Sequence, residues 1–200
     1  MFVLFQVLEN KGYTTSDSKC FLQSFEKKAI EQLKGKTELK RNFLMDDNNK
    51  EYKELWKNDV LEWAKDNEVT GFGFSKTFIV VPKYFQNDSV KDPSLKKYKN
   101  ATETFLIDDA HEAGLDVHVF TFRNEDEKLL FDYGQDFNNG YQTFLDLGID
   151  GFFTDFPATA NRFLNSASTG VNDASFKYLN QLLFLVCFSF VHIFWWKNSM

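Results

Sequence analysis

Short apolar runs alternate along this chain with segments whose apolar residues recur every three or four positions. The runs that we interpret as strands cover residues 19–24, 39–44, 69–81, 115–122 and 149–154. A strand followed by an amphipathic helix, repeated along a chain, is typical of parallel βα units. We interpret the pattern as four such units and predict an α/β fold built on a parallel sheet.

The helical segments between these runs carry recognisable start and stop residues. They cover roughly residues 26–34, 55–64, 103–113, 141–147 and 157–164. Gly114 and Gly148 directly follow two of them, and glycine readily adopts the left-handed conformation that ends a helix. Pro157 suits the first position of the closing helix. A loop containing Pro82 and Pro93 is expected after the third run.

The opening of the chain has the pattern of the middle of a helix. Leu4, Val7 and Leu8 share one face, and Lys11-Gly12 provides a cationic last turn and a glycine stop. The segment lacks the basic region, the long apolar stretch and the cleavage site of a signal peptide. We therefore expect that sequence upstream of this helix belongs to the same domain.

Four parallel units do not close a barrel, because an open half-barrel leaves two bare edges and half of an apolar interior. A complete eightfold barrel needs about 250 residues, whereas this chain has 200. We therefore predict that residues 1–165 form the second half, strands 5–8, of a (β/α)8 TIM barrel.

Composition narrows the class of protein. Of the residues, 43% are hydrophobic and 18% aromatic, which is enough apolar material for a core and excludes intrinsic disorder. The net charge is −6, with lysines spread among acidic residues, so no nucleic-acid partner is expected. Cys20 and Cys187 are too few for a disulfide scaffold or a four-ligand zinc site.

The most hydrophobic stretch, residues 182–196, contains no charged residue. It is shorter than the ~20 apolar residues that usually span a bilayer. Small residues at 168–170, a polar spacer and this apolar run follow in the order of a glycolipid-anchor signal. A short transmembrane anchor and a buried hydrophobic helix remain alternatives. We expect residues 166–181 to be a polar spacer and the protein to be membrane-associated, in the secretory pathway or at the cell surface.

Four ordered motifs carry a family resemblance: CFLQSFE at 20–26, AHEAGL at 110–115, VHVFTFRNE at 117–125 and GIDGFFTDFP at 148–157. In these motifs the chain resembles the glycerophosphodiester phosphodiesterases, notably the periplasmic bacterial and plant cell-surface branches. The resemblance puts the first motif at the family's fifth barrel strand and the last two at the seventh and eighth. It covers roughly residues 2–165.

The resemblance implies an enzyme that hydrolyses glycerophosphodiesters to sn-glycerol 3-phosphate and an alcohol with a divalent cation, Ca²⁺ or Mg²⁺. The family's catalytic and metal-binding motifs are a His-Arg pair, Glu-x-Asp, a second His, and a Glu with a Lys, and none of them occurs in this sequence. His111 falls in a predicted helix and His118 near a strand start, so neither is carried over as catalytic. Asp108, Asp109, His111 and Glu112 lack an H-E-x-x-H pattern, and we interpret them as a solvated helix face.

The residues that this chain would contribute are pocket walls. An amide and a hydroxyl at the end of one strand can bind phosphate or glycerol oxygens, aromatic rings can face the glycerol backbone, and a guanidinium can meet phosphate. An aspartate after the last strand could orient a pocket residue or cap the following helix. The implied substrate-binding residues are Gln23, Ser24, Phe25, Phe120, Thr121, Phe122, Arg123 and Asp155.

Less specific interpretations stay open beside these. Gln23 and Ser24 fit a plain strand end and helix cap, and Arg123 fits a surface ion pair with Glu125 or Asp126, a contact commonly worth about 0–1 kcal/mol. Our leading hypothesis is the C-terminal part of a glycerophosphodiester phosphodiesterase, catalytically incomplete as written. Alternatives are a non-catalytic, membrane-attached binding or regulatory short isoform that pairs through its open barrel edge, and an unrelated function on the same fold.

Overall fold

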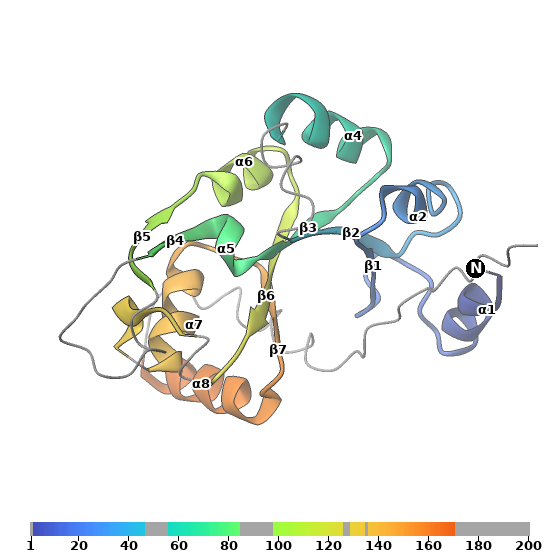
Figure 1. Cartoon of the computed structure of the whole chain (residues 1–200). Helices are drawn as coiled ribbons and strands as arrows, with labels where there is room; N and C mark the ends of the chain where they lie inside the picture. Colours follow the sequence, from blue (N-terminus) through green and yellow to red (C-terminus); the bar gives the residue numbers. More distant parts are fainter. Residues whose placement is uncertain (1, 47–55, 85–97, 126–128, 135, 171–200) are drawn as a thin grey trace, which may run out of the picture.

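The computed structural model describes residues 2–46, 56–84, 98–125, 129–134 and 136–170 (Figure 1). Five parallel strands form one sheet, in the order β1-β2-β3-β6-β7. The strands are β1 (Phe21–Ser24), β2 (Lys40–Met45), β3 (Gly71–Ser75), β6 (Asp116–Phe122) and β7 (Gly151–Thr154). The sheet curves as the partial wall of a barrel does, and helices lie on its outer side (Figure 1). The fold is therefore α/β, with part of a (β/α)8 barrel.

Helices follow or connect the strands. Those that alternate with the strands are α2 (Lys27–Glu31), α4 (Leu61–Asp66) with the preceding π-helical turn η2 (Trp56–Val60), α6 (Leu106–Glu112), α7 (Phe137–Asp146) and α8 (Pro157–Gly170). Helix α1 (Phe2–Asn10) precedes the sheet, and the short elements α5 (Lys76–Ile79) and η5 (Phe131–Tyr133) lie in the connections. An antiparallel pair, β4 (Val80–Tyr84) and β5 (Tyr98–Glu103), joins α5 to α6.

Alternation along the strands divides their side chains between two faces. On the outer face, Phe43, Phe72, Phe74, Val117 and Val119 are 0% exposed. They belong to one core cluster with residues of the covering helices. This packing beneath the helices is the main hydrophobic core.

On the inner face, two positions of β3 are glycines, so these positions present no side chain there. A Cβ on Gly71 would lie 2.7 Å from the carbonyl oxygen of Asp116, and one on Gly73 would lie 2.3 Å from Cδ2 of Leu44. Residues without side chains on the middle strand thus leave room for the larger side chains of β2 and β6, whose inward residues are in register with them.

All five runs that the sequence marks as strands overlap a strand of the sheet, but the sheet has five parallel strands rather than four units. The structure holds only part of a barrel, so the assignment of residues 20–26 to the fifth barrel strand stays a prediction.

The third run, residues 69–81, is not one strand. It contains β3, the single turn α5 and the start of β4, and the loop expected around Pro82 instead begins with a strand of the hairpin. The apolar pattern does not reveal this hairpin, because a continuous apolar run has the same appearance whether or not one helical turn interrupts it.

The N-terminal helix agrees with the sequence-based expectation, whereas the C-terminal helix is longer than expected. Helix α1 forms where the apolar spacing predicts it, whereas α8 continues to Gly170 and so includes the first residues of the expected spacer. The apolar run 182–196 lies outside the described residues. Within the described part of the chain, no helix is both long and apolar enough to cross a bilayer.

Candidate functional site

Because the five strands are parallel, their carboxyl ends meet at one edge of the sheet. In parallel α/β folds this edge carries the ligand-binding residues. The residues that end or follow β1, β3, β6 and β7 there include Phe25, Lys76, Arg123 and Asp155. Sequence positions more than a hundred residues apart are thus brought to one edge.

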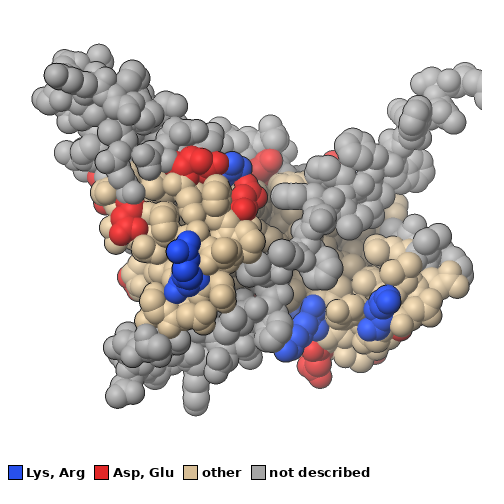
Figure 2. Space-filling view, turned by 90° about the horizontal axis from the view of Figure 1, so that it is seen from below, with Lys and Arg blue, Asp and Glu red and all other residues tan. Residues whose placement is uncertain are grey.

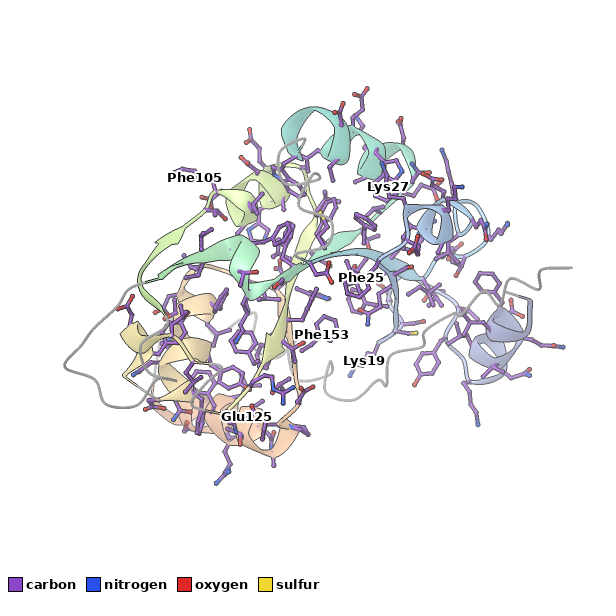
Figure 3. All side chains as sticks on the ribbon, in the orientation of Figure 1. Lys19, Phe25, Lys27, Phe105, Glu125 and Phe153 are labelled. Carbon is purple, nitrogen blue, oxygen red and sulfur yellow. The ribbon has the colours of Figure 1, made fainter. Side chains whose placement is uncertain are left out.

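An aromatic row runs across the inner face from β1 to β7. We use this name for Phe21, Phe25, His118, Phe120 and Phe153. Ring centroids are 5.7 Å apart for Phe25 and Phe120 and 6.4 Å apart for Phe120 and Phe153, both with edge-on geometry. Figure 3 places Phe25 and Phe153 on the concave side of the sheet. The row forms an apolar surface whose rings come from three strands.

His118 is the polar member of the aromatic row. Its ring is edge-on to Phe21 at 4.9 Å and to Phe153 at 6.0 Å, and only 2% of the residue is exposed. Nδ2 of Asn42 donates to Nδ1 of His118 over 2.8 Å, which leaves the ring proton on Nε2. Burial lowers the pKa of His118 to about 4, against the opposing effect of the Asp116 and Asp150 carboxylates. The ring is therefore neutral at pH 7.

Arg123 lies where β6 ends and contacts two carboxylates. Its Nε donates to Oε2 of Glu125 at 3.0 Å and to Oε1 at 3.2 Å, and Nη2 also contacts Glu125. Nη1 pairs with Asp155, which directly follows β7. Figure 3 shows Glu125 at this end of β6. The guanidinium thus ties the ends of two neighbouring strands together.

Lys76 adds a second positive charge beside this pair. It directly follows β3, and its Nζ lies 5.2 Å from the centroid of the Phe122 ring. Burial, reinforced by the positive charge of Arg123 and opposed by Glu125, lowers the pKa of Lys76 to about 8. Lys76 was not among the residues expected from the sequence, because residues 69–81 were interpreted as one extended run and the strand end after Ser75 was not recognised.

Two of the expected pocket residues are placed elsewhere by the fold. Phe122 is 3% exposed and stacks on Tyr141 at 4.6 Å, on the helix-covered side. The pairing of β6 with β7 shifts register between Val119 and Phe122, so Phe122 does not face inward as His118 and Phe120 do. Phe122 thus packs in the helix-covered core, and a contact between Phe122 and substrate stays a prediction.

Ser24 is in register with the outward-facing Phe43, and its Oγ accepts a hydrogen bond from the Glu26 amide at 3.0 Å. This is a local turn contact, close to the less specific interpretation of that residue. Gln23, in contrast, is half-buried and paired with the inward-facing Asn42. Thr121 is half-buried beside Phe120. Of this set, Gln23, Phe25, Phe120 and Thr121 thus remain candidates for ligand contact.

The described residues do not fit a divalent cation. Ca²⁺ and Mg²⁺ need several oxygen ligands, yet no three His, Cys, Asp or Glu side chains gather within the described ranges. Of the carboxylates at the strand ends, Glu125 and Asp155 both pair with Arg123. We therefore assign no metal ligand in this part of the chain.

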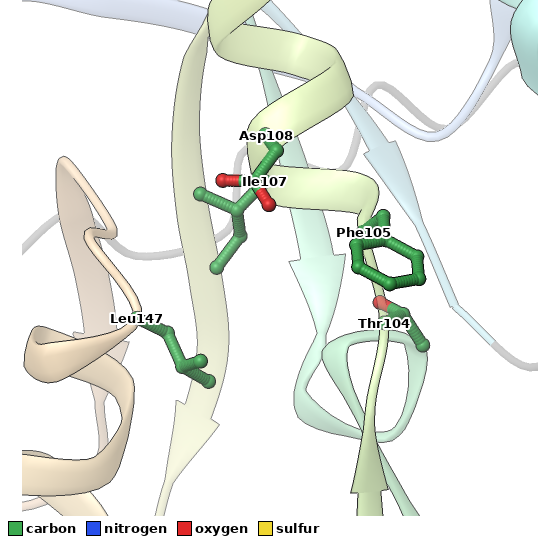
Figure 4. A pocket seen from close by; sticks show the side chains of 5 residues that line it. All are labelled: Thr104, Phe105, Ile107, Asp108 and Leu147. Carbon is green, nitrogen blue, oxygen red and sulfur yellow. The ribbon is translucent and has the colours of Figure 1, made fainter.

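A shallow hollow of about 290 Å³ lies apart from this edge, on the outer flank between α6 and α7 (Figure 4). None of the residues implied by the family resemblance lines it. The lining residues are Thr104, Phe105, Ile107, Asp108 and Leu147. On the face shown in Figure 2, the described acidic and basic side chains are interspersed, which differs from the single-sign patch typical of a nucleic-acid interface.

Comparison with known proteins gives one consistent result. The model of the glycerophosphoryl diester phosphodiesterase family matches residues 3–159. Glycerophosphodiester phosphodiesterase GDPD6 of Arabidopsis thaliana is 30% identical over 151 residues, which are 72% of this chain and 37% of that protein. Glycerophosphodiester phosphodiesterase GDPDL6 of the same plant is 38% identical over 71 residues, 35% of this chain and 9% of that protein. The chain thus spans much less than two thirds of either relative.

Proposed function

Because the chain belongs to the glycerophosphoryl diester phosphodiesterase family, we propose that it forms the substrate-side wall of an enzyme that hydrolyses glycerophosphodiesters to sn-glycerol 3-phosphate and an alcohol. The observation that carries this proposal is the convergence, at one edge of the sheet, of the aromatic row and the Arg123–Asp155 pair. These residues come from the motifs that resemble the family.

The chemistry of this edge suits such a ligand. A glycerophosphodiester combines a short carbon backbone, hydroxyl groups and one negative charge on the phosphate. The rings of Phe25 and Phe120 offer an apolar surface to the carbon backbone, while the Gln23 amide and the Thr121 hydroxyl can hydrogen-bond its oxygens. Two cationic side chains, Lys76 and Arg123, lie at the same edge as this surface.

We propose that the chain does not turn substrate over by itself. Phosphodiester hydrolysis needs groups that move protons and neutralise the phosphoryl oxygens, and the family motifs implied to provide them are absent from this sequence. His118 is neutral and buried, so it is a poor substitute. The divalent cation, Ca²⁺ or Mg²⁺, would then belong to the complete barrel.

Incubating the purified chain with glycerophosphocholine and Ca²⁺ or Mg²⁺ tests this point by the release of glycerol 3-phosphate. We expect no release by the chain alone, and cation-dependent release when a second polypeptide carries the family's His-Arg and Glu-x-Asp motifs. Cation-dependent turnover by the 200-residue chain alone would overturn the proposal of catalytic incompleteness.

A measurement of ligand binding tests whether the aromatic row faces the substrate. We expect Phe120→Ala to weaken the binding of glycerophosphocholine roughly fivefold or more, because the ring is the centre of the aromatic row. Phe105→Ala is the matched control, since that ring is 77% exposed and lies on the outer flank. Calorimetric titration of both variants measures the difference, and equal affinities would contradict a substrate-facing role for the row.

We also propose attachment to membranes in the secretory pathway or at the cell surface. The support is the order of small residues, polar spacer and apolar run 182–196 in the sequence. Expression of the tagged chain in eukaryotic cells tests it: phospholipase release from membranes indicates a glycolipid anchor, and release by detergent alone indicates a transmembrane segment. Recovery in the soluble fraction would contradict attachment.

A further inference from the structure

Lys76 occupies a strand end of the proposed site to which no family motif points. Ser75, the last residue of β3, is in register with Phe120, so Lys76 begins the turn beside the segment that contains Thr121 and Arg123. Its side chain is half-buried, with Nζ 5.2 Å from the Phe122 centroid. Within the described residues, this ammonium group has no hydrogen bond or ion pair.

Arg123, in contrast to Lys76, is surrounded by carboxylates. Its Nε and both terminal nitrogens contact carboxylates, Glu125 on its own segment and Asp155 from β7. Among the described side chains, one positive charge thus faces these two negative charges. A phosphate approaching Arg123 alone would be repelled by both carboxylates, and this repulsion would offset the attraction of the guanidinium.

Counting Lys76 changes this balance. With Lys76 protonated, the four described side chains Lys76, Arg123, Glu125 and Asp155 sum to zero charge, so the second positive charge offsets the repulsion from the two carboxylates. Because Lys76 is half-buried and its three N–H donors have no hydrogen-bond acceptor within the described residues, a bound anion would satisfy donors that are now unpaired. Charge-assisted hydrogen bonds of this kind are the strong ones.

We propose that Lys76 binds the phosphate group of the ligand, and that Arg123 is a positioning residue held between Glu125 and Asp155. The assignment rests on the proposed function for the identity of the full ligand. The binding of a phosphate group by Lys76 does not depend on that identity. Inorganic phosphate and a glycerophosphodiester share the group that Lys76 would contact. Inorganic phosphate therefore tests the role of Lys76, and the glycerophosphodiester also tests the proposed function.

The test uses the full chain labelled with ¹⁵N, with the Lys76 Nζ resonance assigned through Lys76→Arg. Without ligand we expect this amine to titrate near pH 8, in line with its burial. Saturating inorganic phosphate or glycerophosphocholine should raise that pKa toward 10.5, the ordinary value for lysine, because a bound anion favours the protonated form.

Variants provide the second readout. Lys76→Met keeps an unbranched side chain against Phe122 and should weaken the affinity for either phosphate-bearing probe about tenfold or more, whereas Lys76→Arg should retain most of it. Lys28→Met, an exposed lysine of α2, is the matched control and should leave the affinity unchanged. Circular dichroism checks that each variant is folded.

The pH profile separates binding from a structural role. Affinity in the unsubstituted chain should fall as the pH rises through about 8, when Lys76 loses its proton, and this fall should be absent in Lys76→Arg. An unchanged Lys76 pKa with both probes, or equal affinity in Lys76→Met, would overturn the inference even if glycerophosphocholine binds. Binding of inorganic phosphate at Lys76 without binding of glycerophosphocholine would support the inference and refute the proposed function.

Discussion

Replacing Asp150 by alanine tests what fixes the turn that enters β7. Oδ2 of Asp150 accepts a hydrogen bond from the Val117 amide at 2.7 Å and lies 2.8 Å from Nε2 of His111. The carboxylate therefore connects helix α6, strand β6 and the residue before β7. It belongs to the GIDGFFTDFP motif, yet it lies away from the carboxyl edge, so we expect its effect on stability rather than on ligand binding.

The two contacts of Asp150 contribute different amounts to the free energy of unfolding. Val117 is 0% exposed, and removing a charged acceptor from a buried amide costs about 1.5–3 kcal/mol. The pair with His111 is 40% exposed on the histidine side, and such contacts are worth about 0–1 kcal/mol. Asp150→Ala should therefore lower the free energy of unfolding by about 1.5–4 kcal/mol, a large part of the 5–15 kcal/mol typical of a domain.

Urea denaturation followed by circular dichroism measures this change. Asp150→Asn should cost less, because an amide oxygen can still accept from Val117, and His111→Ala should cost at most about 1 kcal/mol. Asp146→Ala, on the exposed face of α7, is the control and should stay within about 0.5 kcal/mol. If His111→Ala were as destabilising as Asp150→Ala, the argument that the buried amide dominates would be refuted.

Two further predictions concern the inner face and one helix. Gly71→Ala should destabilise the fold by roughly 1–3 kcal/mol, since its Cβ would lie 2.7 Å from a backbone oxygen. Gly140→Ala within α7 should stabilise the fold by up to about 1 kcal/mol, since alanine favours the helix and its Cβ would lie 3.4 Å from the Tyr133 ring. Thermal melting of both variants checks the opposite signs. The His118 pKa of about 4 lies below the ordinary 6.5, so its contribution to stability is fully present above pH 6.5 and is lost as the pH falls through about 4. The loss is on the order of 3 kcal/mol, and urea denaturation at pH 7 and pH 4.5 should show a smaller pH dependence for His118→Gln; an identical pH dependence would contradict the assignment to this ring.

Local pattern predicted the strands well because each carries a continuous or alternating apolar run bounded by turn residues. The 115–122 run, for example, contains β6, and Gly114 before it has the positive φ of +74° that a helix end with glycine favours. The third run failed because one helical turn and two strands share the same apolar composition. Periodicity over so few residues does not distinguish them.

The site was predicted in part for a similar reason. Motifs identified Phe25, Phe120, Arg123 and Asp155, all of which lie at the carboxyl edge or on the inner face. They also identified Phe122, whose orientation depends on a register shift that no local pattern records. Lys76 was missed, because its importance comes from the neighbours that folding gives it.

The sequence by itself determined the fold class, the order of the strands along the chain and the family, since these follow from short-range periodicity and from motifs of adjacent residues. Only the tertiary structure decided which side chains meet. It paired Arg123 with Asp155 across 32 positions of the chain and Asn42 with His118 across 76. Burial, the loss of hydration and the charge of spatial neighbours set the states of Lys76 and His118, and these arise only when distant segments pack together.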